Sequence, residues 1–116
     1  KRVITRANKA SKKVGLVTGG GSGHLPVFTG YVGKGLLDAC AVGSVFASPS
    51  VDQIASAIRN ADSGNGVLCV LGNYGGDVMN FEMACEIVDS EGIKTKTVIV
   101  ADDIASASND EKLKRL

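Results

Sequence analysis

The segment from Thr18 to His24 restricts the fold of this chain more than any other part of its sequence. It reads Thr-Gly-Gly-Gly-Ser-Gly-His and follows directly on the apolar residues 14–17, which predict a strand. Glycines at the carboxyl end of a strand let backbone N–H groups approach a polar ligand closely, because no Cβ atoms intervene. The segment ends on the only histidine of the chain, and histidine is the side-chain type best suited to proton transfer near neutral pH. It therefore predicts a ligand loop, with a tight turn without ligand as the alternative interpretation.

The order of the apolar runs predicts an α/β fold. Four runs are typical of strands, at residues 14–18, 37–42, 67–71 and 95–100, and helical patterns lie between them. The run at 67–71 is continuously apolar, which is typical of a strand buried on both faces. Strands that alternate with helices form right-handed crossovers and a parallel sheet. We therefore expect a mainly parallel sheet of about four strands with flanking helices.

Both predicted helices have start signals. Before the first helix, either Ser48 caps the helix with Pro49 at its first position, or Ser50 and Gln53 form a capping box. The second helix is predicted to open at Asp77, where a carboxylate satisfies free N–H groups and favours the helix dipole. Capping alone would explain both Ser48 and Asp77, so neither residue indicates a function by itself.

Polar residues gather where the predicted strands end. Ligands of parallel sheets bind outside the carboxyl ends of the strands, so the loops that follow the four strands share one edge. In chain order these loops hold Gly19 to His24, then Gly43, Ser44 and Ser48, then Asn73 to Asp77, and then Asp102 and Asp103. One site could draw on all four loops. The two adjacent aspartates could also bind a cation, but a solvated loop is the favoured interpretation.

Composition excludes several classes of function. The net charge of +1 and the aromatic content of 4% provide neither a basic surface nor a stacking platform for nucleic acid. No apolar stretch approaches the roughly 18 residues of a membrane helix, and the first residues lack the apolar core of a signal peptide. We therefore expect a cytoplasmic protein without nucleic-acid or membrane partners. Residues 105–116 carry no apolar stripe and are expected to be mobile.

The three cysteines, Cys40, Cys69 and Cys85, include no C-x-x-C pair and have mainly apolar neighbours. This pattern favours buried free thiols in a reducing compartment. Their spacing from His24 is not typical of a metal site, so no metal site is expected.

The glycine loop completes none of three common motifs. With Gly19 and Gly21 as the first glycines of G-x-G-x-x-G, the third position is His24, and with Gly21 and Gly23 it is Pro26. A Walker A loop requires Gly-Lys-Ser/Thr, which does not follow here. The lipase-type G-x-S-x-G pattern fails because position 24 is histidine. A generic phosphate-binding α/β domain remains an alternative to a more specific function.

Five motifs in a fixed order carry a resemblance to a known family. They are Thr18-Gly-Gly-Gly-Ser-Gly-His24, Gly30-Tyr-Val-Gly-Lys-Gly35, Val45-Phe-Ala-Ser-Pro-Ser50, Asn73-Tyr-Gly-Gly-Asp77 with Asn80-Phe81, and Val100-Ala-Asp-Asp-Ile104. This string resembles the substrate-binding subunit of dihydroxyacetone kinases, the DhaK domain. The resemblance implies that residues 1–116 form the amino-terminal part of that domain, within a larger two-domain subunit.

The resemblance implies a kinase that phosphorylates the terminal hydroxyl of dihydroxyacetone or a related short ketose. In that family a histidine far downstream holds the ketone as a hemiaminal, and this chain ends before it, so the fragment alone is expected to be inactive. No cofactor is expected on this chain. ATP or ADP with Mg is expected on a separate nucleotide-binding domain or subunit, which would be its partner, and a homodimer is implied as well.

The resemblance also implies roles for individual residues. Gly21, Ser22 and Gly23 would lie beside the substrate, and Ser48 would line the pocket. His24 would hydrogen-bond a substrate hydroxyl and take part in proton transfer. Asp77 would accept the proton of the attacking terminal hydroxyl as a general base, which suits a reaction that mostly needs a positioned nucleophile.

Two positions depart from the family's pattern. Gly72 stands where the family usually has a lysine that contacts the substrate, and Leu25 stands where a glutamate usually follows the loop histidine. Without the cationic contact the identity of the ketose is open, and a four-carbon ketose such as erythrulose is one option. The alternative function is a non-catalytic paralogue that senses the ketose and regulates a partner.

Overall fold

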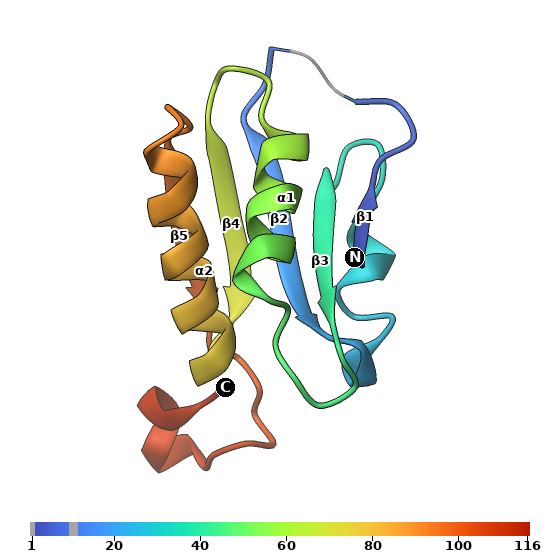
Figure 1. Cartoon of the computed structure of the whole chain (residues 1–116). Coiled ribbons are helices and arrows are strands. Elements are labelled where there is room, and N and C mark those ends of the chain that lie inside the picture. Colours follow the sequence, from blue (N-terminus) through green and yellow to red (C-terminus); the bar gives the residue numbers. More distant parts are fainter. Residues whose placement is uncertain (1, 10–11) are drawn as a thin grey trace.

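The computed structural model describes residues 2–9 and 12–116, which form a five-stranded sheet with two helices packed on one face (Figure 1). The strands are β1 (Val3–Thr5), β2 (Gly15–Gly21), β3 (Ala39–Gly43), β4 (Val67–Gly72) and β5 (Thr95–Val100). The helices are α1 (Val51–Ala61) and α2 (Gly75–Asp89), and short 3-10 turns occur at Ser22–His24, Thr29–Tyr31 and Asn109–Lys114. The predicted α/β class with a mainly parallel sheet is confirmed.

The strand order is β1-β3-β2-β4-β5, with β2 to β5 parallel and β1 antiparallel to β3. The sheet therefore has one strand more than the four predicted from the sequence. The additional strand, β1, lies at the edge and is only three residues long, so it carries no period that could distinguish it from a loop. It pairs Val3 with Ala41 and Thr5 with Ala39.

The predicted glycine loop begins later than expected, because Gly19 to Gly21 belong to β2 and are buried. They pair in register with Ala41 to Gly43 of β3. A Cβ atom on Gly20 would collide with the ring of Phe28, so the missing side chain is what lets that ring pack against the strand. The loop therefore starts at Ser22, directly after the carboxyl end of strand β2.

The core lies between the sheet and the two helices. Its largest side chains are Ile54 and Ile58 from α1, Phe81 and Val88 from α2, Leu71 from β4 and Val17 from β2, and all six are fully buried. Burying a side chain of this size stabilises the fold by roughly 1.5–3 kcal/mol. Both helices cover the same face of the sheet (Figure 1).

The side chains of strand β4 alternate in burial along the strand. Val67, Cys69 and Leu71 are buried, whereas Leu68 and Val70 are only half-buried. The prediction of a strand buried on both faces was therefore wrong for β4. A continuous apolar run cannot distinguish these cases, because it does not say how many layers cover the sheet.

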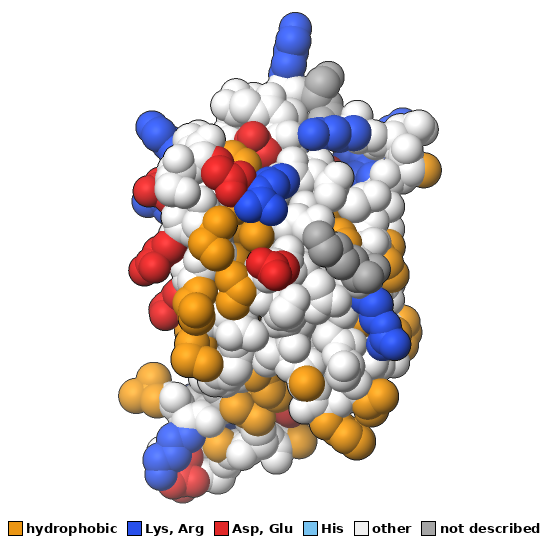
Figure 2. Space-filling model, viewed as in Figure 1, with side chains coloured by type: hydrophobic (Ala, Val, Ile, Leu, Met, Phe, Trp, Pro, Cys, Tyr) orange, Lys and Arg blue, Asp and Glu red, His pale blue; other side chains and the backbone are white. Residues whose placement is uncertain are grey.

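The outer surface of the helices is visible in Figure 2. Arg59 of α1 donates two hydrogen bonds to Glu91, at 2.7 and 2.6 Å, and this exposed ion pair joins α1 to the turn that follows α2. The outward side of α2 exposes Met79, Met83 and Ile87. Within residues 2–9 and 12–116, neither helix is long and apolar enough to cross a membrane.

The final residues return to the carboxyl edge of the sheet. The N–H of Asp103 donates to the carbonyl of Leu116 at 3.0 Å, and the side-chain amide of Asn73 donates to the carbonyl of Arg115 at 2.9 Å. The mobility expected for residues 105–116 stays a prediction.

Candidate functional site

The turn after β2 is fixed by the loop that follows β3. The N–H of Ser22 donates to the carbonyl of Ser44 at 3.1 Å, and the N–H of Gly23 donates to the carbonyl of Val45 at 3.0 Å. Both N–H groups are therefore bound by the protein's own backbone. The turn holds its shape without a ligand and carries His24, which is exposed, at its end.

Ser48 does not cap the first helix. The cap is Ser50, whose hydroxyl accepts the N–H of Gln53 at 3.2 Å while the Gln53 side chain accepts the N–H of Ser50 at 2.8 Å. Of the two start signals seen in the sequence, the capping box is therefore the correct one. Ser48 instead faces α2, where its hydroxyl hydrogen-bonds the carboxyl group of Asp77.

Gly76 makes this contact possible. A Cβ atom at position 76 would lie 2.7 Å from the hydroxyl oxygen of Ser48, closer than real side chains approach. The glycine in the first turn of α2 thus leaves room for the serine beside Asp77.

Asp77 is the third residue of α2, not its first, and its side chain does not cap the helix in the part of the chain that the structure describes. The N-cap position belongs to Tyr74. Burial raises the pKa of the Asp77 carboxyl above its ordinary value of 3.8, while the Ser48 hydrogen bond and the charge of His24 act in the opposite direction. A buried carboxylate with a raised pKa is a stronger base than an exposed one.

The imidazole of His24 lies between two aromatic rings. Its centroid is 5.4 Å from the ring of Tyr74, in a tilted arrangement, and 6.0 Å from the ring of Phe28, in an edge-on arrangement. Such pairs orient a ring and contribute on the order of 1 kcal/mol. The two aromatic neighbours therefore limit the positions that the imidazole can adopt.

A small cavity of about 170 Å³ joins three of these loops. Its walls include Gly21 and His24 from the end of β2 and the following turn, Ser48 from the loop after β3, and Asp77 from α2. At about 30 Å³ for each water-sized group, it has room for roughly five or six non-hydrogen atoms. Ser22 and Gly23 lie between Gly21 and His24 in the chain but are not among the residues that line the cavity.

A wider cavity of about 810 Å³ opens on the other side of His24 and Tyr74, which line both spaces. Asp102 and Asp103 line the wider cavity only. All four predicted loops thus contribute to the same edge, but they divide between two cavities. Among the described residues, no group of three or more His, Cys, Asp and Glu side chains is placed to hold a metal ion.

Sequence reasoning assigned no role to Tyr74, although it lies in both cavities and contacts His24. The signal that could have found it is its position. An aromatic residue directly before a helix at the ligand edge of a parallel sheet has its side chain next to the loops of neighbouring strands.

Comparison with known proteins extends this description. The Dak1 domain profile matches residues 1–116. The chain is 56% identical over 104 residues to the dihydroxyacetone-binding subunit DhaK of a PTS-dependent dihydroxyacetone kinase from Listeria innocua, covering 90% of this chain and 32% of that subunit. It is 50% identical over 103 residues to D-erythrulose kinase of Mycolicibacterium smegmatis, covering 89% of this chain and 18% of that kinase. The chain thus spans about a third or less of these relatives.

Solved structures share the fold at comparable identity. The dihydroxyacetone kinase of C. freundii in complex with AMP-PNP and Mg²⁺ matches with a TM-score of 0.85 and 42% identity, over 89% of this chain and 19% of the kinase. The dihydroxyacetone kinase operon co-activator Dha-DhaQ matches with a TM-score of 0.76 and 40% identity, over 80% of this chain and 29% of the co-activator.

Proposed function

The chain belongs to the Dak1 domain family, and on that premise we propose that it forms the ketose-binding part of a dihydroxyacetone-type kinase. The observation that carries the proposal is the cavity of about 170 Å³ that is lined by His24 and Ser48 from two separate loops and by Asp77 from the first turn of α2. Its size suits a three-carbon ketose, which has six non-hydrogen atoms, whereas a four-carbon ketose, which has eight, would extend beyond it. The similarity to both a dihydroxyacetone-binding subunit and an erythrulose kinase supports this substrate class.

In the proposed reaction, the carboxylate of Asp77 accepts the proton of the terminal hydroxyl of the ketose. The hydroxyl oxygen forms a bond to the terminal phosphorus of the nucleotide, and the bond between that phosphorus and the bridging oxygen breaks. The proton ends on Asp77 and the bridging oxygen leaves with the shortened nucleotide. The raised pKa of Asp77 supports this role, because a base of higher pKa accepts a proton more readily.

His24 is proposed to hydrogen-bond a hydroxyl of the ketose and to take part in proton transfer. Ser48 would hold the Asp77 carboxyl in place through its hydrogen bond while lining the pocket. The backbone at Gly21, Ser22 and Gly23 is proposed to lie beside the substrate. Tyr74 would limit the imidazole to orientations that face the cavity.

The phosphoryl donor is proposed to be ATP or ADP with Mg²⁺, held by a separate nucleotide-binding domain or subunit that is the partner of this chain. The match to a kinase solved with AMP-PNP and Mg²⁺ supports this division. We also propose that the protein works as a homodimer in the cytoplasm. Its three cysteines are free thiols, which suits a reducing compartment.

A second candidate function is a regulatory protein that binds the ketose without transferring a phosphoryl group. The similarity to an operon co-activator favours it. Gly72 favours it as well, because a glycine offers no cation at the carboxyl end of β4, beside the site.

The test is an assay with the full protein, its nucleotide-binding partner, ATP or ADP with Mg²⁺, and a panel of ketoses that includes dihydroxyacetone and both erythrulose enantiomers. A kinase yields a phosphorylated ketose, and we expect His24→Ala to lower turnover by about 10²-fold or more. Ketose binding in calorimetry without product would instead support the regulatory function. Protection of the fold by inorganic phosphate, without any effect of a ketose, would contradict both.

A further inference from the structure

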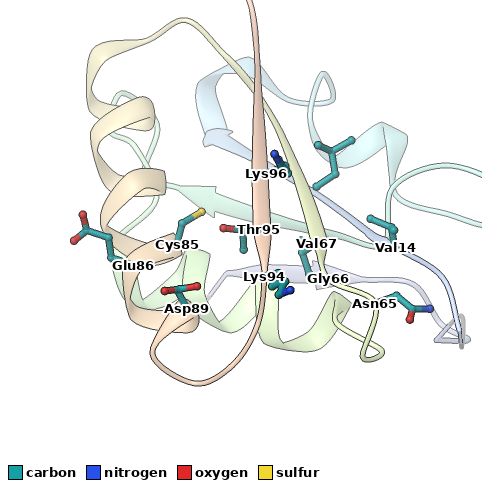
Figure 3. A pocket seen from close by; sticks show the side chains of 11 residues that line it. Val14, Asn65, Gly66, Val67, Cys85, Glu86, Asp89, Lys94, Thr95 and Lys96 are labelled. Carbon is teal, nitrogen blue, oxygen red and sulfur yellow. The ribbon is translucent and has the colours of Figure 1, made fainter.

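A second region with reactive side chains lies at the amino ends of β4 and β5, away from the proposed site. A cavity of about 730 Å³ opens there, and its walls include Cys85 and Thr95 (Figure 3). Figure 3 shows the side chain of Cys85 directed from α2 toward Thr95 on β5. Cys85 is half-buried and so differs from the buried thiol predicted from the sequence.

Cys85 has a second thiol as its neighbour. Cys69 is fully buried on β4, and Cys85 packs against the core cluster that contains it, close enough for each thiol to shift the pKa of the other. The hydroxyls of Thr95 and Thr97 on β5 also hydrogen-bond the sulfur of Cys85. Three elements, α2, β4 and β5, therefore converge on one sulfur atom that borders an open cavity.

The contacts make the two thiols unequal. The hydrogen bond from Cys69, together with those from Thr95 and Thr97, holds the pKa of Cys85 below its ordinary value, although burial and the charge of Glu82 oppose this. Hydrogen bonding to Cys85 and burial raise the pKa of Cys69. Charges of both signs border the cavity, namely Glu86 and Asp89 from α2 and Lys94 and Lys96 from β5 and the turn before it. Cys85 is therefore the thiol that ionises first.

We propose that Cys85 and Cys69 form a peroxide-sensitive pair, in which Cys85 is oxidised through the cavity and Cys69 then closes a disulfide between α2 and β4. The thiolate of Cys85 attacks one oxygen of hydrogen peroxide, so that an S–O bond forms, the O–O bond breaks and hydroxide leaves to become water. The sulfur of Cys69 then attacks the sulfenic sulfur of Cys85, the S–O bond breaks, and the hydroxide leaves with the proton of Cys69 as a second water. The two thiols are oxidised by two electrons in total and the peroxide is reduced.

This pair does not depend on the proposed kinase function, since neither thiol lines the cavity that contains Asp77. Cys40 provides the internal comparison. It is fully buried on β3, and burial raises its pKa to about 11. A thiol of this kind is inert to peroxide at neutral pH, because the thiolate is the reacting form.

The experiment treats the full, reduced protein with hydrogen peroxide, blocks the remaining thiols with an alkylating reagent, and maps the peptides by mass spectrometry without reduction. We expect a linked pair of peptides that contain Cys69 and Cys85, with Cys40 alkylated as a free thiol. Before oxidation, Cys85 should be alkylated at least about tenfold faster than Cys40 at neutral pH, because each pKa unit changes the thiolate fraction tenfold. Absence of the linked peptides, or equal reaction of Cys40 and Cys85, would overturn the proposal.

Two variants test the oxidation of Cys85 and the formation of the disulfide separately. In Cys69→Ala, the sulfenic acid on Cys85 has no resolving thiol, so a dimedone adduct should accumulate that the wild-type protein does not form. In Cys85→Ser, Cys69 should stay reduced, and its oxidation there would contradict the assigned order. The peptide map of the wild-type protein decides the proposal even where a variant folds poorly.

Discussion

Two buried aspartates, one near the amino ends of the parallel strands and one near their carboxyl ends, show how the same residue type can serve structure or chemistry. Asp38, just before β3 at the amino edge, is 8% exposed, and Asp77, at the carboxyl edge, is 5% exposed. Asp38 accepts hydrogen bonds from Arg6 at 3.1 Å, Lys13 at 2.7 Å and the N–H of Leu16 at 2.8 Å. Asp77 has only the hydroxyl of Ser48 and the more distant charge of His24 among the described residues.

The pKa values of the two groups move in opposite directions. Burial alone would raise the pKa of Asp38, but its bonds to Lys13, Leu16 and Arg6 hold it below the ordinary value of 3.8. Burial raises the pKa of Asp77 above the same value, because its weaker partners do not compensate. Both carboxylates are buried, and their different partners therefore distinguish Asp38, which links three segments of the chain, from Asp77, which can accept a proton.

The largest expected effect is the loss of activity in Asp77→Asn. The amide has nearly the same shape but cannot act as a base, so turnover should fall by about 10²–10⁴-fold. Thermal stability should be unchanged or higher, because a buried charge with weak pairing is removed. The measurements are ketose phosphorylation by the full protein with its nucleotide partner, and thermal unfolding.

Asp52→Asn is the matched control for this variant. Asp52 also lies in the first turn of a helix, but it is exposed on α1 and outside the cavity. If the two variants lost turnover equally, the effect of Asp77 would come from the helix dipole rather than from proton transfer.

Asp38→Asn should show the opposite pattern, with a loss of stability and little change in catalysis. Removing this charge leaves Arg6 and Lys13 without their shared partner, which should lower the free energy of unfolding by roughly 2–4 kcal/mol. Denaturant unfolding at neutral pH measures this difference, and a variant as stable as the wild type would contradict the structural role of Asp38.

Acid titration distinguishes the two carboxylates further. The pKa of Asp38 is lowered in the folded state. Its contribution to the free energy of unfolding is therefore complete above the ordinary value of 3.8 and is lost as the pH falls through the folded pKa. The difference in the free energy of unfolding between the wild type and Asp38→Asn should therefore become smaller below this pH. The folded pKa of Asp77 is raised, so the wild type should lose stability relative to Asp77→Asn as the pH rises from 3.8 through the folded pKa.

The sequence predicted the architecture well because strands β2 to β5 and both helices carry long apolar patterns. It could not predict β1, whose three residues have no measurable period. It also placed Gly19 to Gly21 in a loop, because glycine is rare in strands and its reason here is a distant ring, that of Phe28. Tertiary contacts of this kind leave no local signal.

For the candidate site, the sequence named residues without being able to decide their roles. Ser48 and Ser50 are both suitable caps, and only the structure shows which one bonds Gln53. Likewise, position in the chain does not reveal that Asp77 is the third residue of α2 and lies beside Ser48, or that Asp38 forms ion pairs with two cations. These distinctions depend on the pairing of loops across the sheet.

Ser48 and Ser50 differ in the same way as Asp77 and Asp38, and the expected effects of replacing them are smaller. Ser50→Ala removes one half of the capping box and should lower the free energy of unfolding by about 1 kcal/mol without changing turnover. Ser48→Ala should leave stability nearly unchanged and lower turnover. Because the Ser48 hydrogen bond lowers the pKa of Asp77, its loss should also shift the acid limb of the activity profile to higher pH. Equal stability losses in both variants would contradict this division.

The smallest expected effect tests whether Tyr74 controls the position of His24. A Cβ atom on Gly72 would lie 3.0 Å from two ring carbons of Tyr74, so Gly72→Ala should push the ring by a few tenths of an ångström. Because this ring lies 5.4 Å from the imidazole, the shift should raise KM for the ketose about threefold to tenfold, or up to about 1.4 kcal/mol, with kcat nearly unchanged.

Gly75→Ala provides the control on the other side of the same tyrosine, since a Cβ atom there would meet nothing within 4 Å. A rise in KM in Gly72→Ala alone means that the carboxyl end of β4 acts on the imidazole through the tyrosine ring. The same KM in both variants would mean that His24 keeps its place without Tyr74. In that case the turn held by Ser44 and Val45 would be sufficient to position the imidazole, and Tyr74 would be only a wall between the two cavities.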